Sequence, residues 1–202
     1  MALGSFSRSW WDIIVPIGIS LINVVLSKKE QEARKAWENK RDEVNKQVDD
    51  CNEKIQDYLS KKNQNYSYHE LISLHHSSFL AANEAHTLLV DANTSIDAIG
   101  KILIAAKEKR TAIENKLRET KGLIEKEKLY EDLKIIQDLR KNAFTENDKI
   151  KLQSKDLLAK VKHLNNQTRE LKIMIRDNCG ELGKNWYHNL TVRISEKRLR
   201  SL

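Results

Sequence analysis

The stretch from Trp10 to Ser27, WWDIIVPIGISLINVVLS, is the feature that most limits how this chain folds. It is the only long apolar run in a sequence whose residues are 32% charged. A helix that spans a bilayer needs about 20 predominantly apolar residues, within a range of roughly 17–25. The run lies at the short end of that range. We therefore expect residues 10–27 to form a transmembrane-type anchor helix.

The residues that flank the run predict its orientation. Trp10 and Trp11 stand at its N-terminal end, and indole rings prefer the headgroup level of a bilayer. Arg8 alone precedes the run, whereas four basic residues follow it closely: Lys28, Lys29, Arg34 and Lys35. Since basic residues stay on the cytoplasmic side, we expect a single-pass protein of the cell membrane with its C-terminal bulk in the cytoplasm.

Polar residues recur within the run at helical spacing. This polar stripe consists of Asp12, Ser20, Asn23 and Ser27, with Pro16 in phase between the first two. Steps of three and four residues put these positions on one helical face. A polar face is costly in lipid, so it is expected to meet a partner helix or a water-filled space, and an intramembrane carboxylate such as that of Asp12 is a functional candidate. The alternative is that a marginal anchor contains these residues by chance.

A second interpretation of the run is that it never enters lipid. A short apolar helix that carries Asp12, Pro16 and Asn23 also fits the buried face of a partner protein. In that case the chain is a soluble coiled-coil adaptor whose N-terminal helix is covered by its partner. Both interpretations remain open on the sequence alone.

The remainder of the chain predicts an all-α fold. A single Pro and six Gly allow few tight turns, and Lys, Glu, Leu and Ala are abundant, as in long helices and coiled coils. We expect the anchor helix to continue into a long-helix coiled-coil bundle of three to five helices arranged in antiparallel hairpins. The predicted divisions are a short N-terminal segment (1–9), the anchor (10–27), the bundle (28–183) and a basic C-terminal helix (184–202).

The first helix of the bundle is predicted over residues 27–62, directly continuous with the anchor. The 3–4 stepping of the anchor carries on along it as an apolar face, which we name the apolar seam: Trp37, Val44, Val48, Cys51 and Ile55. Such a stripe must be buried against other helices of the chain, against copies of it or against a partner. We assign it to contact between copies, where Cys51 could cross-link to its counterpart in a parallel pair.

A second helix is predicted over residues 68–120, with small residues along its first half that favour close packing. Gly122 is a candidate helix end, and so is the stretch from Asn142 to Asp148; the sequence leaves open at which of them the chain reverses. Heptad spacing then runs without a fault from Ile150 to Ile175, and residues 177–183, DNCGELG, predict a turn.

No catalytic, metal or cofactor site is predicted, and neither is a small-molecule substrate. The histidines at 75 and 76 are adjacent and point to different faces, and no pair has the spacing of a helical zinc site. No nucleophile motif or phosphate-binding glycine loop is present. The chain ends in a basic tail, which comprises Arg193, Lys197, Arg198 and Arg200.

These observations favour a non-enzymatic, membrane-tethered interaction protein. We expect it to assemble as a homo-oligomer or as a subunit of a larger membrane complex, through the polar stripe of its anchor. The soluble adaptor is the alternative. A third class, an electrostatic binder of nucleic acid, draws on the net charge of +7 and the basic tail, but it is not favoured because no recognition motif accompanies them.

Overall fold

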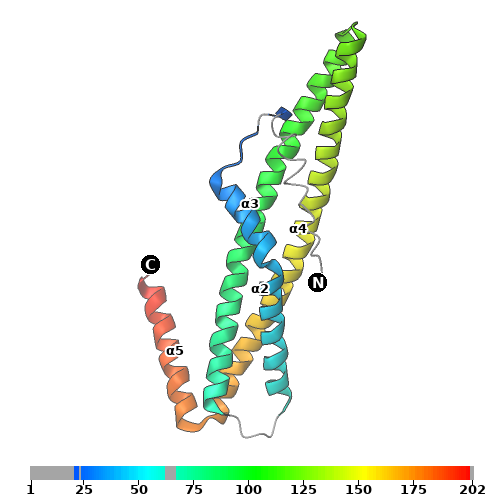
Figure 1. The fold of residues 1–202 in the computed structure, drawn as a ribbon. Helices are drawn as coiled ribbons and strands as arrows, with labels where there is room; N and C mark the ends of the chain where they lie inside the picture. Colours follow the sequence, from blue (N-terminus) through cyan, green and yellow to red (C-terminus); the bar gives the residue numbers. More distant parts are fainter. Residues whose placement is uncertain (1–20, 23, 62–66, 201–202) are drawn as a thin grey trace, which may run out of the picture. The chain divides into compact units, whose positions relative to one another are not determined.

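The computed structural model describes residues 21–22, 24–61 and 67–200, with side chains up to residue 194. Four long helices make up nearly all of this part of the chain: α2 (Lys28–Ser60), α3 (Tyr68–Glu119), α4 (Leu123–Asn178) and α5 (Gly180–Arg200). Figure 1 shows them in chain order, and no strand occurs in the described ranges. The predicted all-α fold of a few long helices is therefore confirmed.

Most of the predicted anchor helix lies outside the part of the chain that the structure describes. Residues 10–20 and 23 lie outside the described part, and with them Trp10, Trp11, Asp12, Ser20 and Asn23. None of the helices within the described ranges combines the length and the apolar character that crossing a bilayer requires. The expectation that the anchor helix continues into the bundle is wrong: Val24–Ser27 are not helical, and α2 starts afresh at Lys28.

Two compact units divide the chain, and the long helices contribute segments to both. The first unit combines residues 1–36 with 91–154, and the second combines 37–90 with 155–202. Within the first unit, the end of α3 and the start of α4 form a helical hairpin. The core of the first unit includes small and aliphatic side chains from α2, α3 and α4: Ala33, Ala92, Ala98, Ile99, Ile102, Ala106, Ile113, Ile136, Leu139, Ala143 and Ile150.

The hairpin turn decides between the two predicted reversal points. The non-helical residues are Thr120–Gly122, where Thr120 N–H donates to the Lys116 carbonyl at 2.9 Å and Lys126 N–H donates to the Gly122 carbonyl at 3.0 Å. Residues 142–148 are helical throughout. The chain therefore reverses at Gly122. The turn at Gly122 ends the helix, whereas the polar residues at 142–148 do not interrupt α4.

The second unit packs the larger part of α2 with the start of α3 and the end of α4. Its core includes Trp37 and Ile55 from α2, Leu71 and Leu88 from α3, and most of the predicted heptad positions of α4. The buried heptad residues of this unit are Leu157, Val161, Leu164, Leu171 and Ile175, which have no exposed surface. Ala81, Ala82 and Ala85 are buried as well, which confirms that the first half of α3 presents small residues to its neighbours.

A sharp corner connects α4 with α5. Only Cys179 separates the two helices, so the predicted seven-residue turn is shorter than expected. Gly180 has φ +57°, a left-handed conformation that favours glycine and lets a helix end at once. Gly183 lies one turn into α5, and a Cβ atom there would overlap the carbonyl oxygen of Ile175. The corner therefore depends on the missing side chain at Gly183.

We predict that Gly183→Ala destabilises the second unit. The added methyl group overlaps the Ile175 carbonyl, so one of the two helices must shift, at a cost of about 2 kcal/mol or more. The measurement is thermal unfolding followed by circular dichroism. Gly100→Ala is the matched control, because a Cβ atom at Gly100 meets nothing within 4 Å and alanine favours the helix by roughly 0.5–1 kcal/mol. An unfolding midpoint of Gly183→Ala equal to that of the native chain would contradict the assigned role of the corner.

Candidate functional site

The start of α2 is fastened by a capping box that joins it to α3. Ser27 N–H and Ser27 Oγ both donate to Glu30 Oε2 at 2.8 Å, and Glu30 N–H donates back to Ser27 Oγ at 3.3 Å. Lys101 Nζ of α3 donates to Glu30 Oε1 at 2.5 Å. Both carboxylate oxygens of Glu30 are thus engaged. This cluster lies immediately after the predicted anchor in the sequence, and it fixes the first turn of α2 on α3.

The electrostatics of this cluster favour the charged form of Glu30. The side chain of Glu30 is only 8% exposed, yet hydrogen bonds from Lys101 and from Ser27 lower its pKa from 4.5 to about 2. The ammonium group of Lys101 adds a smaller electrostatic contribution, and burial opposes the shift. A buried carboxylate with this many donors stays ionised at neutral pH.

The apolar seam is buried within a single copy of the chain. Trp37, Val44, Val48 and Ile55 are no more than 1% exposed and Cys51 is 8% exposed. The side chains that we assigned to contact between copies therefore already contribute to the core of the chain itself. Contact between copies along this face stays a prediction. Little of the surface of these side chains remains exposed for contact with a second copy.

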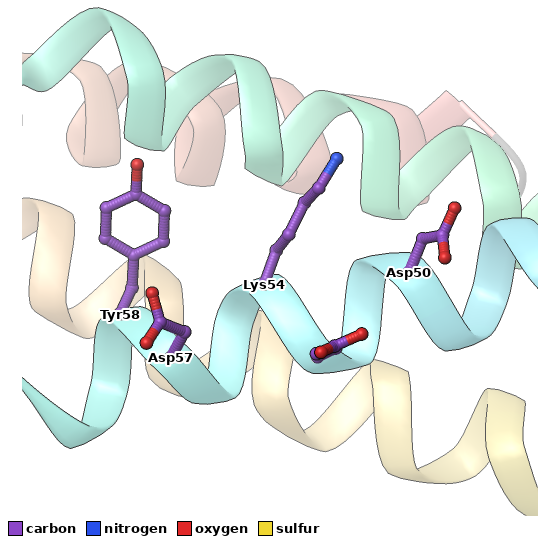
Figure 2. A pocket seen from close by; sticks show the side chains of 5 residues that line it. Asp50, Lys54, Asp57 and Tyr58 are labelled. Atoms are coloured by element: carbon purple, nitrogen blue, oxygen red, sulfur yellow. The ribbon is translucent and has the colours of Figure 1, made fainter.

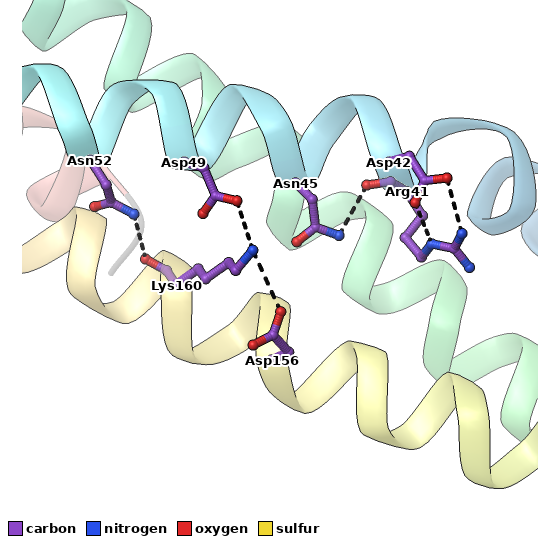
Figure 3. Close-up of polar contacts among 7 residues, drawn as sticks. All are labelled: Arg41, Asp42, Asn45, Asp49, Asn52, Asp156 and Lys160. Carbon is purple, nitrogen blue, oxygen red and sulfur yellow. Dashed lines mark hydrogen bonds and ion pairs between the residues drawn. The ribbon is translucent and has the colours of Figure 1, made fainter.

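Polar contacts fix the register of α2 on α4 within the second unit (Figure 3). Lys160 Nζ binds Asp49 Oδ2 at 2.7 Å and lies 3.6 Å from Asp156 Oδ2, while Asn52 Nδ2 donates to the Lys160 carbonyl at 3.4 Å. The hydrogen bond from Lys160 to Asp49 raises the pKa of the Lys160 ammonium group. Because these groups are partly exposed, each pair contributes little free energy. Their effect is to select one alignment of the two helices.

Two aromatic contacts hold the first half of α5 on the second unit. The ring of Trp186 meets that of His75 of α3 edge-on, with centroids 5.0 Å apart, and the guanidinium carbon of Arg176 of α4 lies 5.3 Å from the Tyr187 ring centroid. Edge-to-face rings and cation–π pairs are each worth about 1 kcal/mol. These two contacts therefore join the first half of α5 to α3 and α4.

His75 is the one strongly perturbed histidine in the described part of the chain. It is 8% exposed, and no partner for its Nε2 atom occurs among the described residues. Burial lowers the pKa of His75 from 6.5 to about 4, and the nearby positive charges of Lys172 and His76 lower it further. The imidazole is therefore neutral at pH 7. It acts as a packing surface for Trp186.

A shallow hollow of about 500 Å³ lies along α2. It is lined by Asp50, Glu53, Lys54, Asp57 and Tyr58. Figure 2 shows the carboxylates of Asp50 and Asp57 on the same stretch of α2 as Lys54 and Tyr58. Tyr58 Oη donates to Glu70 Oε2 of α3 at 3.5 Å, so a further carboxylate lies beside one of the lining residues. The character of the hollow is acidic.

The described residues contain no group of three or more His, Cys, Asp or Glu that is arranged to hold a metal ion. Both cysteines are free thiols, and burial raises the pKa of Cys51 and of Cys179. A raised pKa leaves less of the reactive thiolate at neutral pH. Neither thiol thus has the environment of an activated nucleophile.

The structure brings together only some of the residues singled out from the sequence. Ser27 caps α2, and Arg193 lies exposed on α5, which also contains residues 197, 198 and 200 of the basic tail; their side chains are outside the described part. Lys101 and Lys160 were missed, and His75 was considered only as a metal ligand. The pattern of serine followed three residues later by glutamate at 27–30 signals the capping box, but nothing local identifies the distant partners Lys101 and Lys160.

Comparison of the chain with known protein families, with curated protein sequences and with solved structures finds no match.

We predict that Glu30→Gln loosens the start of α2. The substitution removes the charge that Lys101 meets and weakens the capping box, with an expected loss of about 1 kcal/mol. Since the pKa of Glu30 is lowered on folding, the native contribution is present above pH 4.5 and is lost as the pH falls toward about 2. Hydrogen exchange at the first amides of α2 is the measurement. Glu32→Gln is the control, because the Lys28–Glu32 pair is exposed, and equal exchange in both variants would contradict the prediction.

We also predict a separate loss of stability at mildly acidic pH that originates from His75. Because its folded pKa is about 4 and its ordinary value is 6.5, the unfolded chain takes up the proton first. Stability is therefore full above pH 6.5 and falls as the pH drops to about 4, by up to roughly 3 kcal/mol. Denaturant unfolding at a series of pH values should show a smaller slope in His75→Leu than in the native chain. His86→Leu, at an exposed position of α3, is the control; a native slope in His75→Leu would refute the assignment.

Proposed function

We propose that this chain is a non-enzymatic interaction protein that a single N-terminal segment tethers to the cell membrane, with the helical units in the cytoplasm. It assembles with itself or as a subunit of a larger membrane complex. The observation that carries the proposal is the order of features along the chain. An apolar run with tryptophans at one end and basic residues at the other directly precedes the fastened start of α2.

Two further features support this proposal. The helices carry polar contacts that set their register, as the Lys160 cluster does. The capping box and Lys101 hold α2 at the residue where the apolar run ends, which suits a point of attachment. In this proposal the polar stripe of the anchor makes the contact between membrane segments, with Asp12 as its central residue.

One observation favours the soluble adaptor as a second candidate. Ile22, near the end of the apolar run, is only 8% exposed, so at least one of the run's side chains rests on protein. An apolar run that packs against protein at one end is consistent with an adaptor whose partner buries the remaining apolar side chains of the run. In this candidate the run docks into that partner, and the chain co-purifies with it in the absence of detergent.

The experiment that separates the two is membrane fractionation with alkaline carbonate extraction. We expect the full chain to stay in the pellet and a chain without the residues before Ser27 to be released. The shortened chain keeps Ser27 because its hydroxyl caps α2. Release of the full chain by carbonate would contradict the tether and favour the docked adaptor. In the same assay Asp12→Leu should remain in the pellet, while its cross-linking to other copies or subunits decreases.

A further inference from the structure

The end of the α3–α4 hairpin exposes two adjacent aliphatic side chains. Leu123 and Ile124 begin α4 directly after the turn, and they are 79% and 75% exposed. A shallow hollow of about 720 Å³ lies beside them, lined by residues 121–125 and Lys128. Single exposed apolar side chains are common on protein surfaces, whereas adjacent ones that line a hollow mark a candidate contact surface. We call residues 116–128 the hairpin tip.

Packing within the first unit does not account for this surface. Between Ile113 and Ile136 no side chain is fully buried. Figure 1 shows α3 and α4 running together past the start of α2 to the turn, without another described helix beside them. The turn lies about 30 Å along α3 beyond Lys101, the residue that holds Glu30 of α2. The hairpin tip therefore projects from the rest of the first unit.

The charged side chains of the hairpin tip favour a negatively charged partner. Five of its residues are basic and three are acidic, which gives a net charge of +2. The basic residues are Lys116, Arg118, Lys121, Lys126 and Lys128, and the acidic residues are Glu119, Glu125 and Glu127. None of the five basic side chains forms an ion pair with a described residue. The tip of a second copy would repel this net positive charge, whereas an anionic surface attracts it.

Tyr130 extends the exposed apolar surface along α4. It is 59% exposed and follows Leu123 by seven residues, which puts both side chains on one side of the helix about 10 Å apart. Lys126 lies between them in the sequence. The amphipathic ring of tyrosine prefers the headgroup level of a bilayer, and lysine is attracted by anionic headgroups. The aliphatic end, the lysines and the tyrosine therefore follow the order of layers at a membrane surface.

We propose that the hairpin tip inserts shallowly into an anionic lipid bilayer, with Leu123 and Ile124 in contact with the acyl chains. Interfacial contacts of this kind gain from apolar burial and from charge attraction together, and they need no partner pocket of matching shape. Backbone groups of the turn that lack a helix partner stay at headgroup depth, because hydrocarbon offers them no hydrogen bond. We therefore expect a depth of about 5–10 Å for Ile124.

This contact goes beyond the proposed tether and does not depend on it. The tether is the N-terminal segment, whereas the hairpin tip joins α3 and α4 in the middle of the chain. The non-helical residues Val24–Ser27 allow the N-terminal segment to leave α2 at an angle. An inclined hairpin therefore brings both contacts to one bilayer.

The test places an environment-sensitive fluorophore at the hairpin tip of the full-length chain. Ile124→Cys is labelled with NBD in a background of Cys51→Ala and Cys179→Ala, and the chain is added to vesicles of phosphatidylcholine and phosphatidylserine. We expect the NBD emission to rise at least twofold and to shift to the blue. Spin labels near the lipid headgroups should quench it more strongly than labels at the ends of the acyl chains or iodide in the water.

A second labelling position on the same helix is the matched control. Leu152 is 71% exposed on α4 but lies about 40 Å from the turn. A label on Leu152→Cys should keep the emission that it has in water, because the proposed contact is confined to the tip. An equal change at both positions would contradict insertion through the tip.

Charge reversal tests the attraction to anionic lipid. One variant reverses three lysines of the tip: Lys121→Glu, Lys126→Glu and Lys128→Glu. The blue-shifted fraction at position 124 should fall at least tenfold, to its level on vesicles of phosphatidylcholine alone. The control variant reverses three exposed lysines farther along α4 and should keep the signal: Lys141→Glu, Lys151→Glu and Lys155→Glu. Circular dichroism checks that each variant folds, and equal losses in both variants would refute a specific role of the tip.

A second copy of the chain as the occupant gives a different result. Contact between tips depends on the amount of protein in the membrane, whereas contact with lipid does not. Addition of excess lipid at constant protein should therefore leave the blue-shifted emission at position 124 unchanged. A return of the emission to its value in water would identify a second copy as the occupant and overturn the proposal.

The native chain provides a measurement without substitutions. Lys126 N–H donates to the Gly122 carbonyl, whereas the amides of residues 123–125 precede the hydrogen-bonded ladder of α4 and exchange quickly in water. Their hydrogen exchange should slow several-fold on anionic vesicles relative to vesicles of phosphatidylcholine alone. Equal exchange on the two kinds of vesicle would contradict the proposal. Carbonate extraction reports the tether separately, so emission as in water at position 124 on anionic vesicles refutes insertion of the tip whether or not the tether holds.

Discussion

Burial of narrow apolar stripes is the constraint on which each unit depends. In the second unit, Val48, Ile55 and Leu164 are fully buried, and burying one such side chain is worth about 1.5–3 kcal/mol. The exposed ion pairs beside them contribute at most about 1 kcal/mol each. Apolar packing therefore holds the helices together, while contacts such as that of Lys160 decide the register in which they pack. Between Ile113 and Ile136 no side chain is fully buried, so the end of the α3–α4 hairpin relies on helix formation and the turn.

Periodicity predicted the features that one helix face alone determines. The apolar seam, the heptad positions of α4 and the small residues of α3 are buried as their spacing indicated. The start of α2 was predicted incorrectly. The helical spacing of three and four residues continues through Ser27 and Glu30, so it gave no sign that a new helix begins there. The same two residues form a capping box, and hydrogen bonds of their side chains stop the helix where periodicity alone continues it. Lys101 completes this cluster from 71 residues away, a distance that no local pattern spans.

The structural roles of the glycines could not be told apart from the sequence, for a related reason. Gly122, Gly180 and Gly183 all fall in stretches that predict a turn, but they act differently. Gly122 belongs to the three-residue hairpin turn, Gly180 takes a positive φ angle, and Gly183 is helical and admits a neighbouring carbonyl. A sequence pattern cannot separate a glycine needed for its backbone angle from one needed for its lack of a side chain. The predicted turn at 177–183 was therefore too long, and α5 began earlier than expected.

The non-helical residues Val24–Ser27 have a mechanical consequence. A continuous helix transmits rotation about its axis, because each turn is hydrogen-bonded to the next. Four residues without that ladder transmit tension along the chain but little torque. A pull on the N-terminal segment therefore reaches α2 at its capped first turn, where Glu30 and Lys101 bear it, whereas a rotation of the segment is absorbed in the joint. The break at Val24–Ser27 therefore uncouples α2 from rotation of the residues before it, while Ser27 and Glu30 hold its first turn in place.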